Sequence, residues 1–371
     1  MLKSKSLMPA PSPDSTSAGS SKFKAQRSRL FCPASLLTVL LLLLLTVACK
    51  TPISAPPPAA GLTRYEFSSP HMGTLFHITL FATNVAVAEA AADAAFHRIA
   101  ALEEILSDYQ ADSELNRLRD APHAFPIRVS DDLFRVMERA QWLARKSDGA
   151  FDPTAGAFVR LWRFSRKRHT LPTPDEIRAA RQVSGYQLLR LDRHGHTITK
   201  LAPGMRFDLG GIAKGYAADE ALAVLKLHGI PRGLVAASGD LALGDPPPGQ
   251  TGWTVGLSEI GARSNQIVLT LRLSNAGIST SGDAEQALEI NGVRYSHILD
   301  PKTGLGLTNR IQATVIAPNA TLSDSLATTV CILGPQNGLR LINSIAGTHA
   351  AVFWMQSNQV HRVWSPRFPK P

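Results

Sequence analysis

The stretch Asp208-Leu-Gly-Gly-Ile-Ala-Lys-Gly-Tyr-Ala-Ala-Asp219 constrains the fold of this chain more than any other. Gly210, Gly211 and Gly215 allow the backbone to turn sharply and to approach a ligand closely. Lys214 stands where the turn becomes a helix, so its ammonium and the helix N-terminus together favour a phosphate. The glycine spacing fits neither G-x-G-x-x-G nor G-x-x-x-x-G-K-[ST]. The stretch therefore predicts a phosphate-facing connection between a strand and a helix, with a purely structural glycine-rich connection as the alternative.

The composition is that of a folded protein. The 371 residues allow one large domain or two ordinary ones, and 44% hydrophobic with 18% charged residues is not a disordered composition. The formal net charge is +10, and about half of it lies in residues 1–48. The short basic run Arg163–Arg168 is interpreted as a solvated loop, so we predict no nucleic-acid surface.

The N-terminus has the pattern of a targeting segment. A basic lead precedes the apolar run Leu36–Ala48, which is too short to cross a membrane and fits a signal-peptide core. Cys49 follows in Thr-Val-Ala-Cys, which resembles the lipobox of bacterial lipoproteins although Thr46 stands where leucine is usual. We predict a signal peptide over residues 1–48, a lipid-anchored Pro/Ala tether over 49–62 and a folded domain over 63–365. An ordinary cleaved signal with an incidental cysteine is the alternative.

Hydrophobic periodicity predicts alternating helices and strands, hence a mixed α+β fold. Helices are expected over residues 85–106, 131–146, 175–183 and up to 227, with a short helix capped by Asp112 or Ser113 and another starting at Asp152-Pro153-Thr154. Strands are expected at residues 72–81, 188–191, 196–200, 253–257, 266–273 and 313–317 and near 233–244. Residues 275–283 are interpreted as a polar glycine turn.

Two polar clusters in the C-terminal half suggest chemistry. His297, Asp300, Lys302 and Thr303 fall within one turn region closed by glycine, although a lone histidine there is often structural. Asp324 and Thr328 are four residues apart on a predicted helix, so their oxygens can face the same ion. Two protein oxygens with room for water and phosphate oxygens suit Mg²⁺.

The motifs of this chain, taken in order, resemble those of the ApbE family, whose members are FAD:protein FMN transferases. The resemblance covers roughly residues 65–335. The matching motifs are Met72-Gly-Thr, Ser107-Asp-Tyr-Gln-Ala-Asp-Ser-Glu-Leu, Phe151-Asp-Pro-Thr-Ala-Gly, Leu161-Trp-Arg-Phe, the opening stretch, Ser238-Gly-Asp, Ser279-Thr-Ser-Gly, His297-Ile-Leu-Asp-Pro-Lys-Thr-Gly and Ser323-Asp-Ser-Leu-Ala-Thr. Three positions depart from the family pattern: Arg163 and Ser238 replace glycines and Ser323 replaces an alanine.

The resemblance implies a fold, a site and an activity. It implies mixed sheets flanked by helices, with FAD in a cleft between two lobes. Mg²⁺ is expected on Asp324, Thr328 and the carbonyl of Gly211. Residues expected to line the FAD site are Met72, Tyr109, Ala150, Phe151, Asp152, Asp208, Lys214 and Ile298. His297, Lys214 and Asp300 are the catalytic candidates, and His297 is the candidate for proton transfer because histidine titrates near neutral pH.

The expected reaction transfers the FMN half of FAD to a threonine or serine of a target flavoprotein, for example a subunit of a membrane redox pump. The protein is expected on the periplasmic side of a bacterial membrane, held by lipid at Cys49. One alternative is a Mg²⁺-dependent FAD pyrophosphatase that releases FMN and AMP. The other is a non-catalytic flavin-binding lipoprotein, which the presence of both His297 and Asp324 makes the weaker hypothesis.

Overall fold

The structure is a computed structural model that describes residues 61–260, 267–282 and 287–369. The chain divides into two units, Met1–Pro57 and Pro58–Pro371, and the described residues all belong to the second. The predicted signal peptide, Cys49 and nearly all of the tether lie outside the described residues. Within the described residues, no helix has the length and hydropathy needed to cross a membrane.

An eight-stranded sheet forms the centre of the fold, with strand order β1-β2-β6-β7-β10-β15-β16-β17. Every neighbouring pair in it is antiparallel. The strands are β1 (Thr63–His71), β2 (Thr74–Ala82), β6 (Gly233–Ala237), β7 (Asp240–Leu243), β10 (Ala276–Gly282), β15 (Ile311–Ala317), β16 (His349–Gln356) and β17 (Gln359–Trp364). Because β15 is buried at every position, both faces of the sheet must be covered at its middle.

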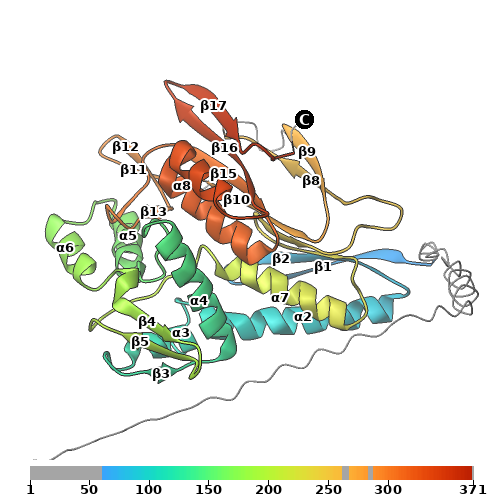
Figure 1. The fold of residues 1–371 in the computed structure, drawn as a ribbon, viewed down its shortest axis with the longest axis horizontal. Coiled ribbons are helices and arrows are strands. Elements are labelled where there is room, and N and C mark those ends of the chain that lie inside the picture. The colour runs from blue at the N-terminus through green and yellow to red at the C-terminus, as the bar shows by residue number, and fades with distance from the viewer. Residues whose placement is uncertain (1–60, 261–266, 283–286, 370–371) are drawn as a thin grey trace, which may run out of the picture. The chain divides into compact units, whose positions relative to one another are not determined.

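Three helices cover one face of this sheet (Figure 1). They are α2 (Val85–Leu106), which packs on β1 and β2, α7 (Ala213–Leu227), which packs on β6 and β7, and α8 (Ala320–Asn343), which packs on β10 and β15. The opposite face carries the hairpin of β8 (Trp253–Leu257) and β9 (Leu269–Leu273), whose apolar residues form a separate buried cluster with those of the sheet. The sheet is therefore the middle of three layers.

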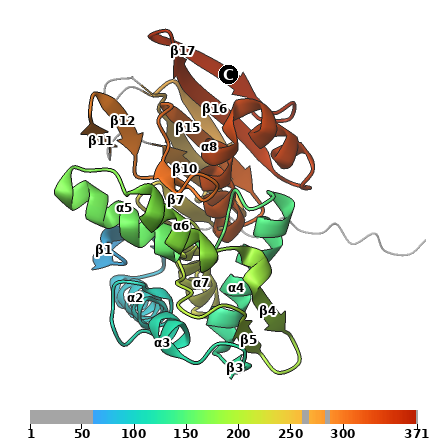
Figure 2. The ribbon, with the colours of Figure 1, turned by 90° about the vertical axis from the view of Figure 1, so that its left-hand side faces the viewer.

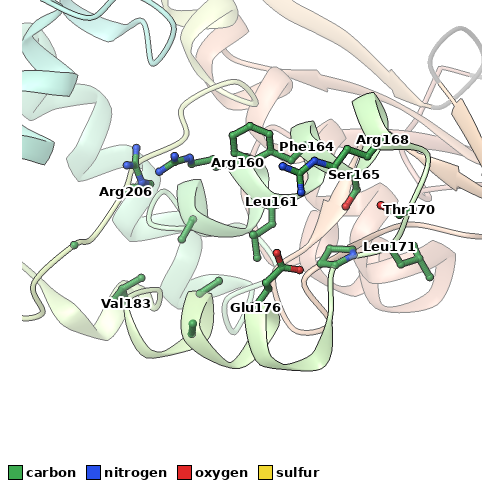
Figure 3. A pocket seen from close by; sticks show the side chains of 15 residues that line it. Arg160, Leu161, Phe164, Ser165, Arg168, Thr170, Leu171, Glu176, Val183 and Arg206 are labelled. Atoms are coloured by element: carbon green, nitrogen blue, oxygen red, sulfur yellow. The ribbon is translucent and has the colours of Figure 1, made fainter.

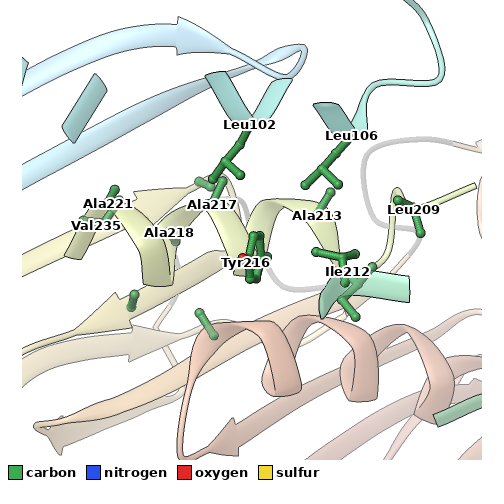
Figure 4. Close-up of a cluster of buried hydrophobic side chains, with 14 of the residues drawn as sticks. Leu102, Leu106, Leu209, Ile212, Ala213, Tyr216, Ala217, Ala218, Ala221 and Val235 are labelled. Carbon is green, nitrogen blue, oxygen red and sulfur yellow. The ribbon is translucent and has the colours of Figure 1, made fainter. Parts of the chain in front are cut away.

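Small side chains allow α7 to lie close to its neighbours. Ala213, Ala217 and Ala221 are buried along one side of α7, where Leu102 and Leu106 of α2 meet them (Figure 4). Alanine combines a high helix propensity with little bulk, so it supports a helix that is packed on several sides. The turn of the opening stretch is thereby held firmly at the start of α7.

The remaining elements form a smaller group, seen at the front in Figure 2. They are α3 (Glu114–Asp120), α4 (Asp131–Lys146), α5 (Gly156–Arg168), α6 (Pro174–Gln182), the 3-10 turn Tyr186–Leu188, and the sheet of β3 (Ile127–Arg128), β5 (Thr197–Lys200) and β4 (Leu189–Asp192). Two short hairpins complete the fold: β11 (Ala287–Ile290) with β12 (Val293–Ser296), and β13 (Leu299–Asp300) with β14 (Leu305–Gly306). The mixed α+β class predicted from the sequence is confirmed.

Local signals located several elements correctly. The helices over residues 85–106 and 131–146 are confirmed as α2 and α4, and Ser130 caps α4 by accepting the Leu133 N–H at 3.2 Å. Ser113, not Asp112, caps α3 through the Asn116 N–H at 3.1 Å.

Three expectations were wrong. Residues 276–282 form strand β10 in the middle of the sheet instead of a turn; its Gly277 is required because an added Cβ would lie 2.2 Å from the backbone of Asn319. The helix expected at Asp152 begins at Gly156, because the Asp152 carboxylate accepts the Thr154 N–H at 2.8 Å and closes a separate turn. The basic run up to Arg168 is the end of α5, not a loop.

The crossing of α7 and α8 is made by backbone contact at Gly215. A Cβ at this position would lie 2.2 Å from the Ala320 carbonyl oxygen and 2.8 Å from the Asp324 Cβ. The two helices also cap each other. Asp324 of α8 accepts the Gly215 N–H in the first turn of α7 at 3.0 Å, and Asp219 of α7 accepts the Ala320 and Thr321 N–H groups, both at 2.8 Å. Carboxylates are favoured at helix N-termini, so each helix stabilises the other.

We predict that Gly215→Ala destabilises the protein by about 2 kcal/mol or more, because the added methyl group forces the two helices apart. Helix propensity alone predicts the opposite sign, a gain of about 1 kcal/mol. Urea unfolding measures the change. Ala223→Ser, on the exposed side of the same helix, is the control and should stay near wild type. A stabilised Gly215→Ala variant would show that the close approach is absent.

Candidate functional site

The predicted metal ligands meet at the α7–α8 crossing. Asp324 is buried, with 2% of its surface exposed, and Thr328 lies one turn further along α8. The Thr328 Oγ1 is 3.1 Å from the Ser281 Oγ of β10. A Cβ added to Gly211 would lie 3.2 Å from the same Thr328 Oγ1, so the backbone of Gly211 faces this hydroxyl. The structure thus brings Gly211, Asp324 and Thr328 together, while their function as ligands stays a prediction.

Asp324 shares its surroundings with a second buried carboxylate and a single ammonium. Lys214 pairs with Asp240, whose side chain is 3% exposed. Burial raises the pKa of Asp324 to about 7, and the Asp240 carboxylate adds to this rise. Burial lowers the pKa of Lys214, but the Asp324 and Asp240 carboxylates outweigh this effect, so the pKa is raised and the ammonium stays charged. With two buried carboxylates and one ammonium, a cation at this place would be stabilised.

The donor set fits Mg²⁺ better than a soft metal. Among the described residues, no group of three or more His, Cys, Asp or Glu side chains is arranged to hold a metal. Mg²⁺ does not need such a group, because it is held by one or two carboxylates with water and substrate phosphates. Asp324 with the oxygens of Thr328 and Gly211 is a set of this kind.

The segment that holds Ala150, Phe151 and Asp152 lies against the opening stretch. An added Cβ on Gly211 would be 3.4 Å from a ring carbon of Phe151, and the Asp208 N–H donates to the Pro153 carbonyl at 2.9 Å. Burial raises the pKa of Asp152, although its carboxylate accepts hydrogen bonds from Thr154 and from the Tyr186 N–H. Burial likewise raises the pKa of Asp208, and the neighbouring Asp108 adds to the rise. The structure therefore places these predicted FAD-binding residues next to each other and beside the predicted metal ligands.

Met72 and Tyr109 occupy connections at the edge of the fold. Met72 has a φ of 50° in the turn between β1 and β2 and lines a hollow of about 320 Å³ with His71 and Glu103. Tyr109 lies in the loop between α2 and α3 and is 78% exposed, which is unusual for a large aromatic side chain. Both therefore lie on connecting segments, as binding residues often do.

The His297 segment forms its own turn between β12 and β14. The Asp300 carboxylate accepts the Lys302 N–H and its carbonyl accepts the Gly304 N–H, both at 2.8 Å. Ile298 is buried, whereas His297 is exposed. Because Asp300 closes the turn that follows His297, its contacts support a positioning function, and the catalytic function predicted for both residues stays a prediction.

Two carboxylates at the crossing, Asp240 and Asp219, have contacts that were not predicted from the sequence. Asp240 is the partner of Lys214, and Asp219 holds the N-terminus of α8. Asp240 is the last residue of the Ser238-Gly-Asp motif, and Asp219 is the last residue of the opening stretch. The pairing of Lys214 with Asp240, 26 positions away, depends on the arrangement of the sheet and cannot be predicted from local sequence. Because a buried carboxylate needs a partner, an aspartate next to an apolar strand was the available sign of such a pairing.

A second hollow lies away from these residues. It measures about 440 Å³ and lies between α5 and α6, where Arg160, Phe164 and Arg168 point into it together with Arg206 (Figure 3). None of the predicted site residues lines this hollow. The candidate site is consequently defined by the crossing of α7 and α8 and not by this hollow.

The comparisons with known proteins agree with this geometry. The sequence profile of the ApbE family matches residues 72–353. The chain belongs to the ApbE family. This ApbE-family protein is 32% identical over 346 residues to the FAD:protein FMN transferase of Salmonella typhimurium. The matched region covers 91% of this chain and 96% of the relative. The protein is 31% identical to the FAD:protein FMN transferase of Treponema pallidum over 307 residues, or 78% of this chain and 84% of the relative.

Solved structures of the family have the same fold. The flavin transferase ApbE from Vibrio cholerae matches with a TM-score of 0.74 and 27% identity, covering 82% of this chain and 98% of that one. The flavinyl transferase ApbE of Pseudomonas stutzeri matches with a TM-score of 0.73 and 27% identity, covering 82% and 95%.

Two of the three positions that depart from the family motifs, Ser238 and Ser323, differ in how well the local structure accommodates them in this ApbE-family chain. Ser238 has a φ of 58° as the first residue of the two-residue turn between β6 and β7, a conformation that favours glycine. The Ser323 Oγ lies 2.8 Å from the Ser279 Oγ of β10, so the added hydroxyl is hydrogen-bonded where it is buried. Neither substitution removes a charged group of the candidate site.

We predict that Lys214→Met lowers the free energy of unfolding by about 3 kcal/mol, because it leaves Asp240 and Asp324 buried without a counter-charge. Lys214→Met combined with Asp240→Asn should recover a large part of that loss. Urea unfolding of the two single variants and the double variant gives the coupling energy. Additive effects of the two substitutions would contradict the ion pair.

Proposed function

We propose that this protein transfers the FMN part of FAD to a threonine or serine hydroxyl of a target flavoprotein. The hydroxyl oxygen forms a bond to the FMN phosphorus, the bond from that phosphorus to the bridging oxygen breaks, and AMP leaves. The hydroxyl proton goes to a base. Membership of a family whose curated relatives are named FAD:protein FMN transferase supports this reaction.

The observation that carries the proposal is the grouping of Asp324, Thr328 and Lys214 at a glycine turn beside the start of α7. Here the helix amides and the Lys214 ammonium favour a diphosphate. Asp324, Thr328 and the Gly211 carbonyl would hold Mg²⁺, which supplies charge stabilisation to phosphoryl transfer when it is bound. Phe151 and Asp208 would line the FAD beside this group. His297, exposed on its turn, is the candidate base for the acceptor hydroxyl.

We further propose that the acceptor belongs to a protein outside the cytoplasm. The basic lead, the apolar run and Cys49 support a lipid anchor that holds the domain on the periplasmic side of a bacterial membrane. The Pro/Ala tether would give the domain reach toward a membrane-bound target such as a redox-pump subunit.

A transfer assay tests the function. The protein is incubated with FAD, Mg²⁺ and a threonine-bearing flavoprotein domain from a redox pump, and covalent flavin is detected by fluorescence in a denaturing gel. Asp324→Asn keeps an oxygen for the Gly215 N–H but loses the charge, so we expect a fall of about a hundredfold to a thousandfold. Asp175→Asn, at an exposed residue of α6, is the control. Release of free FMN without labelled protein would identify a pyrophosphatase, and labelling that is unaffected by chelator would contradict the metal.

A further inference from the structure

The loop that carries Tyr109 is rigid in its backbone while the tyrosine side chain is left exposed. The Ser107 Oγ accepts the N–H groups of Tyr109 and Gln110, both at 3.2 Å. The Asn116 side-chain amide donates to the carbonyls of Asp108 at 3.2 Å and Gln110 at 2.6 Å. The Tyr109 ring is 78% exposed, so the backbone hydrogen bonds alone would not stop the side chain from changing rotamer.

Arg163 of α5 restrains that ring. Its guanidinium carbon lies 4.1 Å from the centroid of the Tyr109 ring, and its Nη1 donates to the carboxylate of the preceding residue, Asp108. The arginine is itself partly withdrawn from water, with 33% of its side chain exposed. It thus holds two consecutive loop residues at once, one through an ion pair and one through stacking.

This arrangement covers one face of the Tyr109 ring and leaves the other face free. Within the described residues, no aromatic ring stacks on Tyr109, which stays 78% exposed with the guanidinium against its ring. A planar group that is fixed on one side is well prepared to stack a flat ring on the other, because little rotamer freedom remains to be lost on binding.

We propose that Arg163 is a positioning residue of the FAD site, which holds Tyr109 in the orientation that stacks a ring of FAD. The inference rests on the proposed FAD site and names a residue at a position where the family motif usually has glycine. Arg163 acts on FAD affinity through Tyr109 and leaves the phosphoryl chemistry to the α7–α8 crossing.

The test is a set of FAD affinities measured by titrating each variant and following the visible absorption change of the bound flavin. We expect Arg163→Ala to weaken FAD binding about threefold to fivefold. Arg163→Lys keeps the charge near Asp108 but cannot stack as a plane, so it should resemble Arg163→Ala. Arg166→Ala, an exposed arginine on the same helix, is the matched control and should bind like wild type.

A double-mutant cycle separates positioning from a direct charge effect. In a Tyr109→Ala background, Arg163→Ala should have no further effect on FAD affinity, because the ring it positions is gone. FMN carries the flavin ring of FAD and ADP carries its adenine ring. The ligand whose ring lies against Tyr109 should lose affinity by the same factor as FAD. Wild-type affinity for Arg163→Lys, or additive losses in the cycle, would overturn the proposal. FAD binding that follows the expected pattern without any flavin transfer would instead refute the proposed activity and leave this inference standing.

Discussion

The structure depends on the reciprocal capping of α7 and α8. Asp219 on the first helix binds the N-terminal amides of the second, and Asp324 on the second binds the Gly215 amide in the first turn of the first. Only a glycine at position 215 lets the two backbones come close enough for both contacts. Because the cap of α7 is also the predicted metal ligand, the packing of the fold and the geometry of the site are fixed by the same contact.

This constraint explains the electrostatics of the site. Asp324 cannot move to solvent without losing its contact with α7, so its charge must be balanced where it lies. Lys214 provides part of the balance but is shared with Asp240, and burial with the nearby carboxylates raises the pKa of Asp324 to about 7. The proposed Mg²⁺ would complete the balance and would favour the phosphates of FAD beside it. The buried Asp324 and Asp240 carboxylates, which oppose folding, would therefore favour the binding of a cation.

Much of the fold could be predicted from local sequence. Ser130 and Ser113 marked helix starts because a side-chain cap is a local interaction. Strand β10 was missed because its composition is that of a turn: Gly277 is there to admit the backbone of α8, and Ser279 and Ser281 are hydrogen-bonded to Ser323 and Thr328, so tertiary contact overrides local propensity.

The candidate site was predicted partly from the order of the motifs and partly from local geometry. The proximity of Asp324 and Thr328 on α8 could be anticipated because residues four apart share a helix face. The pairing of Lys214 with Asp240 and the capping by Asp219 could not, since they depend on which helix lies over which strands. The contact between Arg163 and Tyr109 was likewise hidden, because it joins a helix residue to a loop residue 54 positions away, and no periodicity connects the two.

A crystal structure of the protein with Mg²⁺ and FAD tests the central claim most directly. We expect an ion coordinated by the Asp324 carboxylate, the Thr328 hydroxyl and the Gly211 carbonyl, with the FAD diphosphate at the first turn of α7. Ion density elsewhere, or FAD bound in the hollow between α5 and α6 with Asp324 free of metal, would contradict it.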